Sequence, residues 1–140
     1  MNLVFDNSKP KYANSPDIVS DLLSTYLKNA DETDQQKEHF FVLCLNRRNR
    51  VTNIELITLG TLSETLIHPR EVFKIAILRN SANIIIAHNH PSEETDPSEQ
   101  DLKITKRLKE AGKLIGIDVL DHVIFTINNN YLSFKESYLI

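Results

Sequence analysis

The stretch NIIIAHNHP, residues 83–91, joins an apolar segment directly to a histidine-rich one. Residues 83–87 form a short apolar run bounded by polar residues, which is typical of a strand that is covered on both faces of a sheet. His88-Asn89-His90-Pro91 follows at once. Residues 98–111 then predict a helix that Gly112 ends. A buried strand, a polar loop and a helix in this order favour an α/β fold.

The segments before this unit predict a helix, a hairpin and a second helix. Ser15-Pro16-Asp17 is typical of a helix start, with Ser as the cap and Pro at the first helical position. Residues 29–36 form a polar break that predicts a linker or turn. Residues 39–45 and 51–59 are apolar and β-branched and flank a polar turn, which indicates an antiparallel hairpin. Pro69 is expected to start the second helix.

The segments after the unit complete the predicted sheet. Residues 114–120 and 123–127 predict two closing strands, and residues 131–134 predict a last short strand. Helical and strand patterns alternate without repeats, so we expect one α/β domain with a mixed sheet flanked by helices over residues 15–140. The polar residues 1–14 are expected to be a loose N-terminal segment.

Composition and charge restrict the function. The 140 residues are 41% hydrophobic and 25% charged, as in a globular domain. A net charge of -3 disfavours a free-standing nucleic-acid binder, although Arg47-Arg48-Asn49-Arg50 could form a local basic patch. Cys44 is the one cysteine and lies in an apolar run, which excludes an internal disulfide and a cysteine-rich zinc site. Neither a membrane span nor a signal peptide is apparent, so we expect a cytoplasmic protein.

His88 and His90 are the candidate metal ligands. Two histidines separated by one residue at a strand end can turn toward one point if the chain stays extended. Catalytic zinc sites keep three protein ligands and an open fourth position, and a nearby carboxylate such as Asp101 would complete the set. Ser98-Glu99-Gln100-Asp101 also matches a helix capping box. The two roles of Asp101 are compatible, because a cap fixes where the helix begins and hence where the carboxylate points.

The other histidines are expected to be structural. His39 alternates with core residues in a strand, and His68 precedes Pro69 at a helix start. His122 follows Asp121 between the two predicted closing strands, where a hydrogen-bonded structural pair is expected. None of the three is predicted to bind a metal.

The spacing His88-x-His90-Pro91, six residues, then Ser98-x-x-Asp101 resembles the JAMM signature of the JAB/MPN metalloprotease superfamily. Further blocks resemble the RadC-like branch, and the resemblance runs from about Glu38 to Phe134. It implies a JAB/MPN, cytidine deaminase-like architecture. The blocks are Gly60-Thr61-Leu62, His68-Pro69-Arg70-Glu71-Val72-Phe73, Ala87-His88-Asn89-His90-Pro91-Ser92 and Leu120-Asp121-His122.

The resemblance also implies roles for individual residues. It assigns one Zn²⁺ per chain to His88, His90 and Asp101. It assigns the hydrogen bond to the developing oxyanion to Ser98, and the role of general base toward the metal-activated water to Glu38. Such a site hydrolyses a peptide, isopeptide or similar amide bond of a peptide or protein substrate.

The general base has alternatives. Glu38 could instead be a solvated surface residue, and Glu64 and Glu71 are rivals for its role. Glu71 also suits the first turn of a helix, where the helix dipole favours an acid.

The loop between the histidines and Ser98 departs from the family pattern. RadC-like domains usually carry Gly after Pro-Ser, whereas this chain has Glu93. A side chain there disfavours positive φ, so we expect the loop to take a different path. Glu94 and Asp96 add negative charge, which would repel phosphates or favour a basic substrate.

Two function classes follow from the sequence. The first is a JAMM-type zinc metallopeptidase, and the second is a DNA-repair-associated or non-catalytic RadC-like module. The intact ligand set favours the first. The acidic balance and the lack of the helix-hairpin-helix region of longer RadC proteins count against DNA binding by this chain alone. Because related domains often pair, a homodimer is a further expectation.

Overall fold

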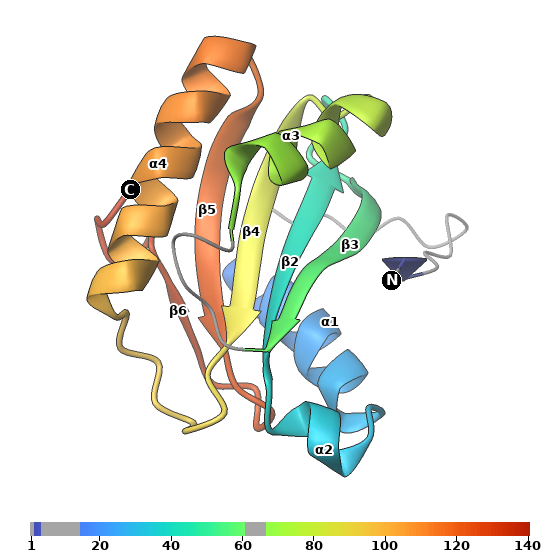
Figure 1. Cartoon of the computed structure of the whole chain (residues 1–140), viewed down its shortest axis with the longest axis vertical. Coiled ribbons are helices and arrows are strands. Elements are labelled where there is room, and N and C mark those ends of the chain that lie inside the picture. Colours follow the sequence, from blue (N-terminus) through green and yellow to red (C-terminus); the bar gives the residue numbers. More distant parts are fainter. Residues whose placement is uncertain (1, 4–14, 61–66) are drawn as a thin grey trace.

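The computed structural model describes residues 2–3, 15–60 and 67–140. Their strands form one six-stranded sheet in the order β1-β3-β2-β4-β5-β6, with helices on both faces (Figure 1). This confirms the predicted α/β domain with a mixed sheet flanked by helices. The strands are β1 (Asn2–Leu3), β2 (Glu38–Leu45), β3 (Val51–Gly60), β4 (Asn83–Asn89), β5 (Asp118–Phe125) and β6 (Tyr131–Ser133). The helices are α1 (Pro16–Lys28), α2 (Glu32–Gln35), α3 (Pro69–Leu78) and α4 (Glu99–Ile115).

The strand directions place one edge of the sheet at the candidate site. β2 pairs antiparallel with β3, as the hairpin prediction required, and also antiparallel with β4. β4 and β5 are parallel, and α4 supplies the crossover that parallel neighbours need. The carboxyl ends of β4 and β5 therefore meet the amino end of β2 at the same edge. The basic turn after β2, residues 46–50, lies at the opposite end of that strand.

Strand residues alternate between two cores. On the face of α3 and α4, the strands bury Phe40, Val42, Ile84 and Ile86. On the other face, residues such as Ile85 pack with the apolar stripe of α1. Figure 1 shows α3 and α4 in front of the sheet and α1 behind it. β4 is buried on both faces as predicted, and Cys44 is buried in the strand beside it.

The first two helices begin near the expected positions. α1 starts at Pro16 with Ser15 as its N-cap residue, and α3 starts at Pro69 with His68 as its N-cap residue. The predicted polar break at residues 29–36 contains the short helix α2, which the sequence interpretation missed. Because α2 has no buried residues, it has no apolar stripe that could have revealed it.

The predicted end of the last helix is wrong. α4 continues through Gly112 to Ile115 and is capped by Gly116, which has φ 86° in the left-handed region. Gly112 serves close packing instead, since a Cβ there would lie 2.4 Å from the carbonyl oxygen of Ile117 and 3.2 Å from Cζ of Phe73. Two glycines four residues apart therefore have different functions, and the first was mistaken for the cap.

The two predicted closing strands are one strand, β5. The polar pair Asp121 and His122 was taken as a break, yet both residues lie buried within the strand. Their backbone continues because both side chains have partners inside the protein. The Asp121 carboxylate accepts hydrogen bonds from the His122 backbone N–H (2.7 Å) and the Ser133 hydroxyl (2.6 Å). Asp121 and His122 are thus hydrogen-bonded as predicted, but through the His122 backbone, because the side chains of neighbours in a strand point to opposite faces.

The predicted loose segment and part of one motif fall mostly outside the described residues. Asn2 and Leu3 pair with β3, and residues 1 and 4–14 lie outside the description. Residues 61–66, which include the rival base Glu64, also lie outside it. No helix in the described ranges is long and apolar enough to cross a membrane.

Candidate metal centre

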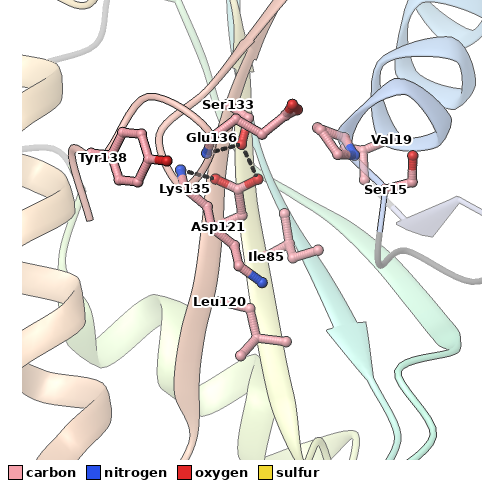
Figure 2. Close-up of a pocket in the computed structure, with 10 residues that line it drawn as sticks. Ser15, Val19, Ile85, Leu120, Asp121, Ser133, Lys135, Glu136 and Tyr138 are labelled. Carbon is pink, nitrogen blue, oxygen red and sulfur yellow. Dashed lines mark hydrogen bonds between the residues drawn. The ribbon is translucent and has the colours of Figure 1, made fainter.

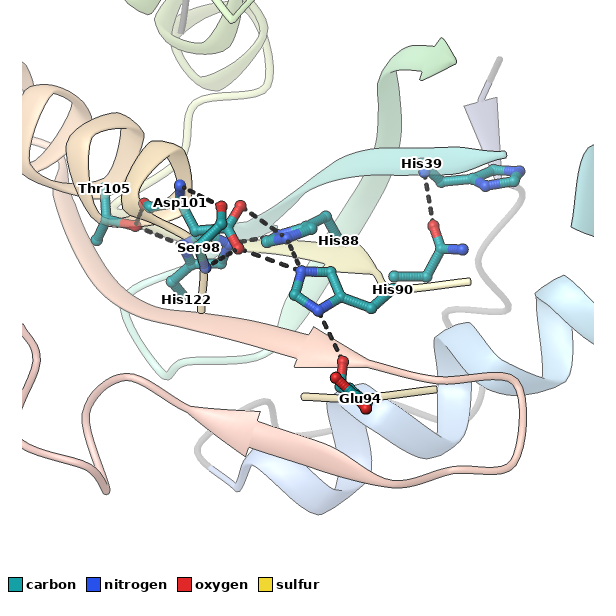
Figure 3. A network of polar contacts seen from close by, with 9 residues as sticks. His39, His88, His90, Glu94, Ser98, Asp101, Thr105 and His122 are labelled. Carbon is teal, nitrogen blue, oxygen red and sulfur yellow. Dashed lines mark hydrogen bonds and ion pairs between the residues drawn. The ribbon is translucent and has the colours of Figure 1, made fainter. Parts of the chain in front are cut away.

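The two histidines and the carboxylate come from the strand and the helix that the loop connects. His88 lies near the end of β4, and His90 follows that strand, with its N–H bonded to the carbonyl of Phe125 at 3.0 Å. Asp101 lies in the first turn of α4. Figure 3 shows the three side chains converging between the strand end and the helix start. The structure therefore brings together the three predicted ligands.

The potential ligand atoms are close to one another. Nε2 of His88 and Nε2 of His90 are 3.0 Å apart. Oδ1 of Asp101 lies 3.1 Å from Nε2 of His88, and Oδ2 lies 3.2 Å from Nε2 of His90. Ligand atoms on a tetrahedral zinc ion, with bonds of about 2.0–2.1 Å, lie about 3.3–3.4 Å apart. The cluster is thus slightly tighter than a loaded site and needs only a small expansion.

The chemistry of this donor set fits a cation. Nδ1 of His90 is 2.7 Å from the carbonyl oxygen of Glu94, which can only accept, so this nitrogen carries the hydrogen. A neutral His90 therefore presents the lone pair of Nε2 to Asp101 and His88. In the described ranges, these residues are the one group of three or more whose His, Cys, Asp or Glu ligand atoms all lie within 4.8 Å of one another. The cluster can hold a metal ion.

The electrostatics of the cluster agree with this reading. Burial lowers the pKa of His90, but its hydrogen bonds with Asp101 and the Glu94 carbonyl outweigh burial and leave the pKa raised. Burial would raise the pKa of Asp101, but His88 and His90 hold it far below its ordinary value. Both shifts show that the cluster favours added positive charge, which a proton or a metal ion can supply.

Asp101 caps α4 as predicted, and its carboxylate also lies beside the two histidines. Its carboxylate accepts the Ser98 backbone N–H at 2.9 Å, and the Ser98 hydroxyl oxygen accepts the Asp101 N–H at 3.1 Å. This is the predicted capping box. The box fixes the first turn of α4 and so directs the carboxylate toward the histidines. The Ser98 hydroxyl keeps its own hydrogen, because this bond uses only its oxygen as an acceptor.

A cleft of about 520 Å³ opens beside the cluster. Glu38, the first residue of β2, lines it together with His90, Ser98 and Asp101. Register explains the position of Glu38: Phe40 pairs with His88, so Glu38 lies on the same sheet face, next to His90. Four of the five sequence-predicted site residues therefore line one cleft, and the fifth, His88, is buried behind it in contact with His90 and Asp101. Pro91, Ser92 and Gln100 complete its lining.

The structure also shows where the alternative general base Glu71 lies and which conformation the acidic loop adopts at Glu93. Glu71 is exposed in the first turn of α3 and does not line the cleft. Glu93 adopts φ 68° despite its side chain, so the expectation that positive φ is lost at this position is wrong. The Glu93 side chain accepts a hydrogen bond from the Asn128 amide, which helps to hold this conformation.

The sequence interpretation missed the residues behind the three clustered side chains. His122 lies 2.7 Å from Nδ1 of His88, and Thr105 in turn contacts His122. Asn89 ties the strand end to β2, since its side chain accepts the His39 N–H at 2.6 Å and donates to the Lys37 carbonyl at 3.0 Å. One signal was present for Thr105, because it lies four residues after Asp101 and thus on the same face of α4.

A second pocket, of about 390 Å³, lies on the opposite face of the sheet (Figure 2). Its buried acid is Asp121, whose pKa is raised by burial, against the opposing effect of hydrogen bonds from Ser133, Lys135 and His122. The Lys135 N–H donates to Asp121 at 2.9 Å and ties the C-terminal segment to β5. Because these bonds use both carboxylate oxygens, we assign Asp121 a structural function.

Comparison with known proteins agrees with this geometry. The family model described as RadC-like JAB domain matches residues 13–139. A UPF0758 protein of Desulforamulus reducens is 50% identical over 110 residues, which cover 79% of this chain and 48% of that protein. A UPF0758 protein of Alkaliphilus metalliredigens is 49% identical over 122 residues, covering 87% of this chain and 50% of that protein.

The chain spans about half the length of these curated relatives. Their names state a family and no activity. The match to the family model covers nearly the whole chain. It includes the cluster of His88, His90 and Asp101, and also Glu38 and Ser98, which line the cleft. This chain belongs to the RadC-like JAB domain family.

Proposed function

We infer that the chain is a zinc-dependent hydrolase of the JAMM type, which cleaves a peptide, isopeptide or similar amide bond. The observation that carries this inference is that His88, His90 and Asp101 cluster beside a cleft. Glu38 and Ser98 line this cleft together with His90 and Asp101. A buried cluster of three acceptor groups without an adjacent reactive group would suit a structural metal. Here a carboxylate and a hydroxyl face the same open space.

The proposed ligands match zinc in type and number. Two imidazoles and one carboxylate are a set found in catalytic zinc sites, which leave the fourth position open. A bound zinc ion would polarise a substrate carbonyl and lower the pKa of water at the site to about 7. His88 is fully buried and Asp101 nearly so, which would hold their side chains in place during a reaction.

Glu38 and Ser98 supply the remaining groups. The Glu38 carboxylate would accept a proton from the attacking water and deliver it to the leaving amine. The Ser98 hydroxyl would donate a hydrogen bond to the developing oxyanion, since its hydrogen is not used in the capping box. The rigid capping box gives this hydroxyl a fixed position before the substrate arrives.

The proposed substrate is a peptide or protein with basic residues near the scissile bond. Glu93, Glu94 and Asp96 are exposed on the loop that connects the two histidines to α4. Glu38 adds a further acid at the cleft. This charge would attract lysine and arginine side chains and repel phosphates.

Zinc content and cleavage test the two parts of this proposal. Purified wild-type chain, His88→Ala and Glu38→Gln are assayed by elemental analysis and against a pool of quenched fluorescent peptides. We expect about one zinc per chain in wild type and Glu38→Gln, and little in His88→Ala. Cleavage should fall by roughly 10²-fold or more in Glu38→Gln, because the general base is lost while the metal is kept.

Two results would oppose the proposal. An equal zinc content in wild type and His88→Ala would contradict zinc binding by the proposed ligands. Full zinc loading, with no cleavage of peptides or isopeptide-linked substrates, would oppose the hydrolase function. Binding to DNA that weakens steeply with salt would then favour a non-catalytic, DNA-associated module.

A further inference from the structure

A chain of buried hydrogen bonds runs behind the first metal ligand (Figure 3). Nδ1 of His88 lies 2.7 Å from Nε2 of His122, and Nδ1 of His122 lies 2.5 Å from Oγ1 of Thr105. The Thr105 hydroxyl donates to the backbone carbonyl of Asp101 at 2.8 Å. His88 and His122 are 0% exposed and Thr105 is 3% exposed, so water does not compete for these bonds. The chain therefore connects one ligand to the backbone of another.

The last acceptor sets the direction of every bond in this chain. The carbonyl of Asp101 can only accept, so Thr105 must use its single hydrogen there. The Thr105 oxygen must then accept from Nδ1–H of His122. A neutral His122 has no second N–H, so its Nε2 accepts from Nδ1–H of His88. In a neutral His88 the lone pair is left on Nε2, which is the atom that faces the metal cluster.

The surroundings of His122 support a neutral ring. Its ring stacks on Phe134 at a centroid distance of 4.4 Å and meets Phe40 edge-on at 6.2 Å. Its two nitrogens face a hydroxyl and an imidazole rather than a carboxylate. A charged ring here would be desolvated without a direct counter-ion, which is unfavourable.

We propose that His122 and Thr105 are positioning residues that hold His88 in the Nδ1–H tautomer and so present its Nε2 to the metal. This proposal rests on the metal site of the proposed function. His90 reaches the same state more directly, because its Nδ1 faces the Glu94 carbonyl at 2.7 Å. Each histidine ligand is thus oriented by hydrogen bonding that ends on a backbone carbonyl. Such contacts behind a ligand affect metal affinity, typically by 10- to 100-fold.

The variant Thr105→Val tests this series of hydrogen bonds, because valine has nearly the same shape as threonine but no hydroxyl. Valine offers no acceptor to Nδ1–H of His122, so the proton should move to Nε2 and donate to His88. His88 would then carry its own hydrogen on Nε2, where it blocks the metal. We expect zinc affinity to fall by about 10- to 100-fold, measured by competition with a chromophoric chelator. Thr105→Ser keeps the hydroxyl and should restore the affinity.

Thr126→Val is the matched control. Thr126 is also fully buried, and its hydroxyl oxygen accepts the Asn130 N–H at 3.1 Å, outside the chain behind His88. We expect this variant to lose stability without losing zinc affinity. Circular dichroism and thermal unfolding of all variants would separate loss of fold from loss of affinity.

A second readout does not need zinc. Two-bond ¹⁵N–¹H correlation spectra of the zinc-free wild-type chain should show the hydrogen of His122 on Nδ1, and those of Thr105→Val should show it on Nε2. A hydrogen on Nε2 of wild-type His122, or unchanged zinc affinity in folded Thr105→Val, would overturn the proposal. If wild type binds no zinc, the proposed function fails, while the spectra still decide the tautomer.

Discussion

His39 shows what burial does to a single titratable residue. It lies in β2 with 1% of its surface exposed, stacked on Phe41 at 5.9 Å and edge-on to Tyr26 at 6.3 Å. Burial lowers its pKa, and the hydrogen bond from Nδ1 to the Lys37 carbonyl opposes this only in part. The folded protein therefore holds His39 neutral in a range where the unfolded chain takes up a proton.

We predict that His39 makes the protein less stable in mild acid. Because the pKa of His39 is lower in the folded state, the unfolded chain binds more protons below about pH 6.5. The free energy of unfolding is therefore full above about pH 6.5 and decreases as the pH falls toward the folded-state pKa. The slope is at most about 1.4 kcal/mol per pH unit. Urea unfolding at pH 7.5 and 5.5 should show a smaller loss for His39→Phe, which keeps the ring contacts. Equal losses in both proteins would contradict the prediction.

At the residue scale the sequence predicted which three residues cluster, but not the side chains that contact them from behind. His88, His90 and Asp101 are close in sequence and follow a recognisable spacing, so one strand and one helix suffice to relate them. His122 lies on a later strand, and its link to His88 exists only because β4 and β5 pair in parallel, with Ile86 opposite His122. Periodicity within a segment carries no information about such a pairing.

Gly112 and Gly116 lie one helical turn apart and allow a test of why each is glycine. Helix propensity alone predicts that Gly112→Ala stabilises α4 by about 1 kcal/mol. Close packing predicts the opposite, a loss of about 1–3 kcal/mol, because the new methyl group would overlap the Ile117 carbonyl. We expect the loss, measured by denaturant unfolding.

The control for this prediction is Gly116→Asn. No atom lies within 4 Å of a Cβ at Gly116, whose φ of 86° alone requires the residue type. Asparagine tolerates the left-handed region better than other residues with side chains, so we expect a smaller loss than for Gly112→Ala. A more stable Gly112→Ala would show that the helix and Ile117 separate easily.

At the element scale, strong patterns were interpreted correctly and weak ones were not. The hairpin of β2 and β3 and the start of α3 carry clear apolar and proline signals, and the structure confirms them. β5 was divided because Asp121 and His122 are polar, although tertiary hydrogen bonds satisfy both. A polar residue inside a strand is compatible with the core when its partner comes from another element, which local sequence cannot show.

At the scale of the whole molecule, metal binding should stabilise the fold. The proposed ligands join β4 to α4, so an ion that binds only the folded chain shifts the unfolding equilibrium. Zinc at 100 times its Kd would add about 2.7 kcal/mol. For a domain of this size we expect Tm to rise by several degrees, roughly 2–8 °C per kcal/mol.

Thermal unfolding of chelator-treated protein, with and without added zinc, measures this effect. His88→Ala should show no rise, and Thr126→Val should show the same rise as wild type from a lower starting Tm. A rise of equal size in His88→Ala would indicate zinc binding elsewhere.

The alternation of β4 links strand register to metal uptake. Ile84, Ile86 and His88 face α4, whereas Ile85 and Ala87 face α1. A slip of one residue would move every side chain to the other face, and would place Asn89 where His88 belongs. A misregistered chain could keep apolar residues in both cores, since residues 84–87 are all apolar, and yet fail to bind zinc at the proposed site. Zinc would then bind and stabilise only chains with β4 in the native register. The metal content of a preparation would therefore report the fraction of such chains.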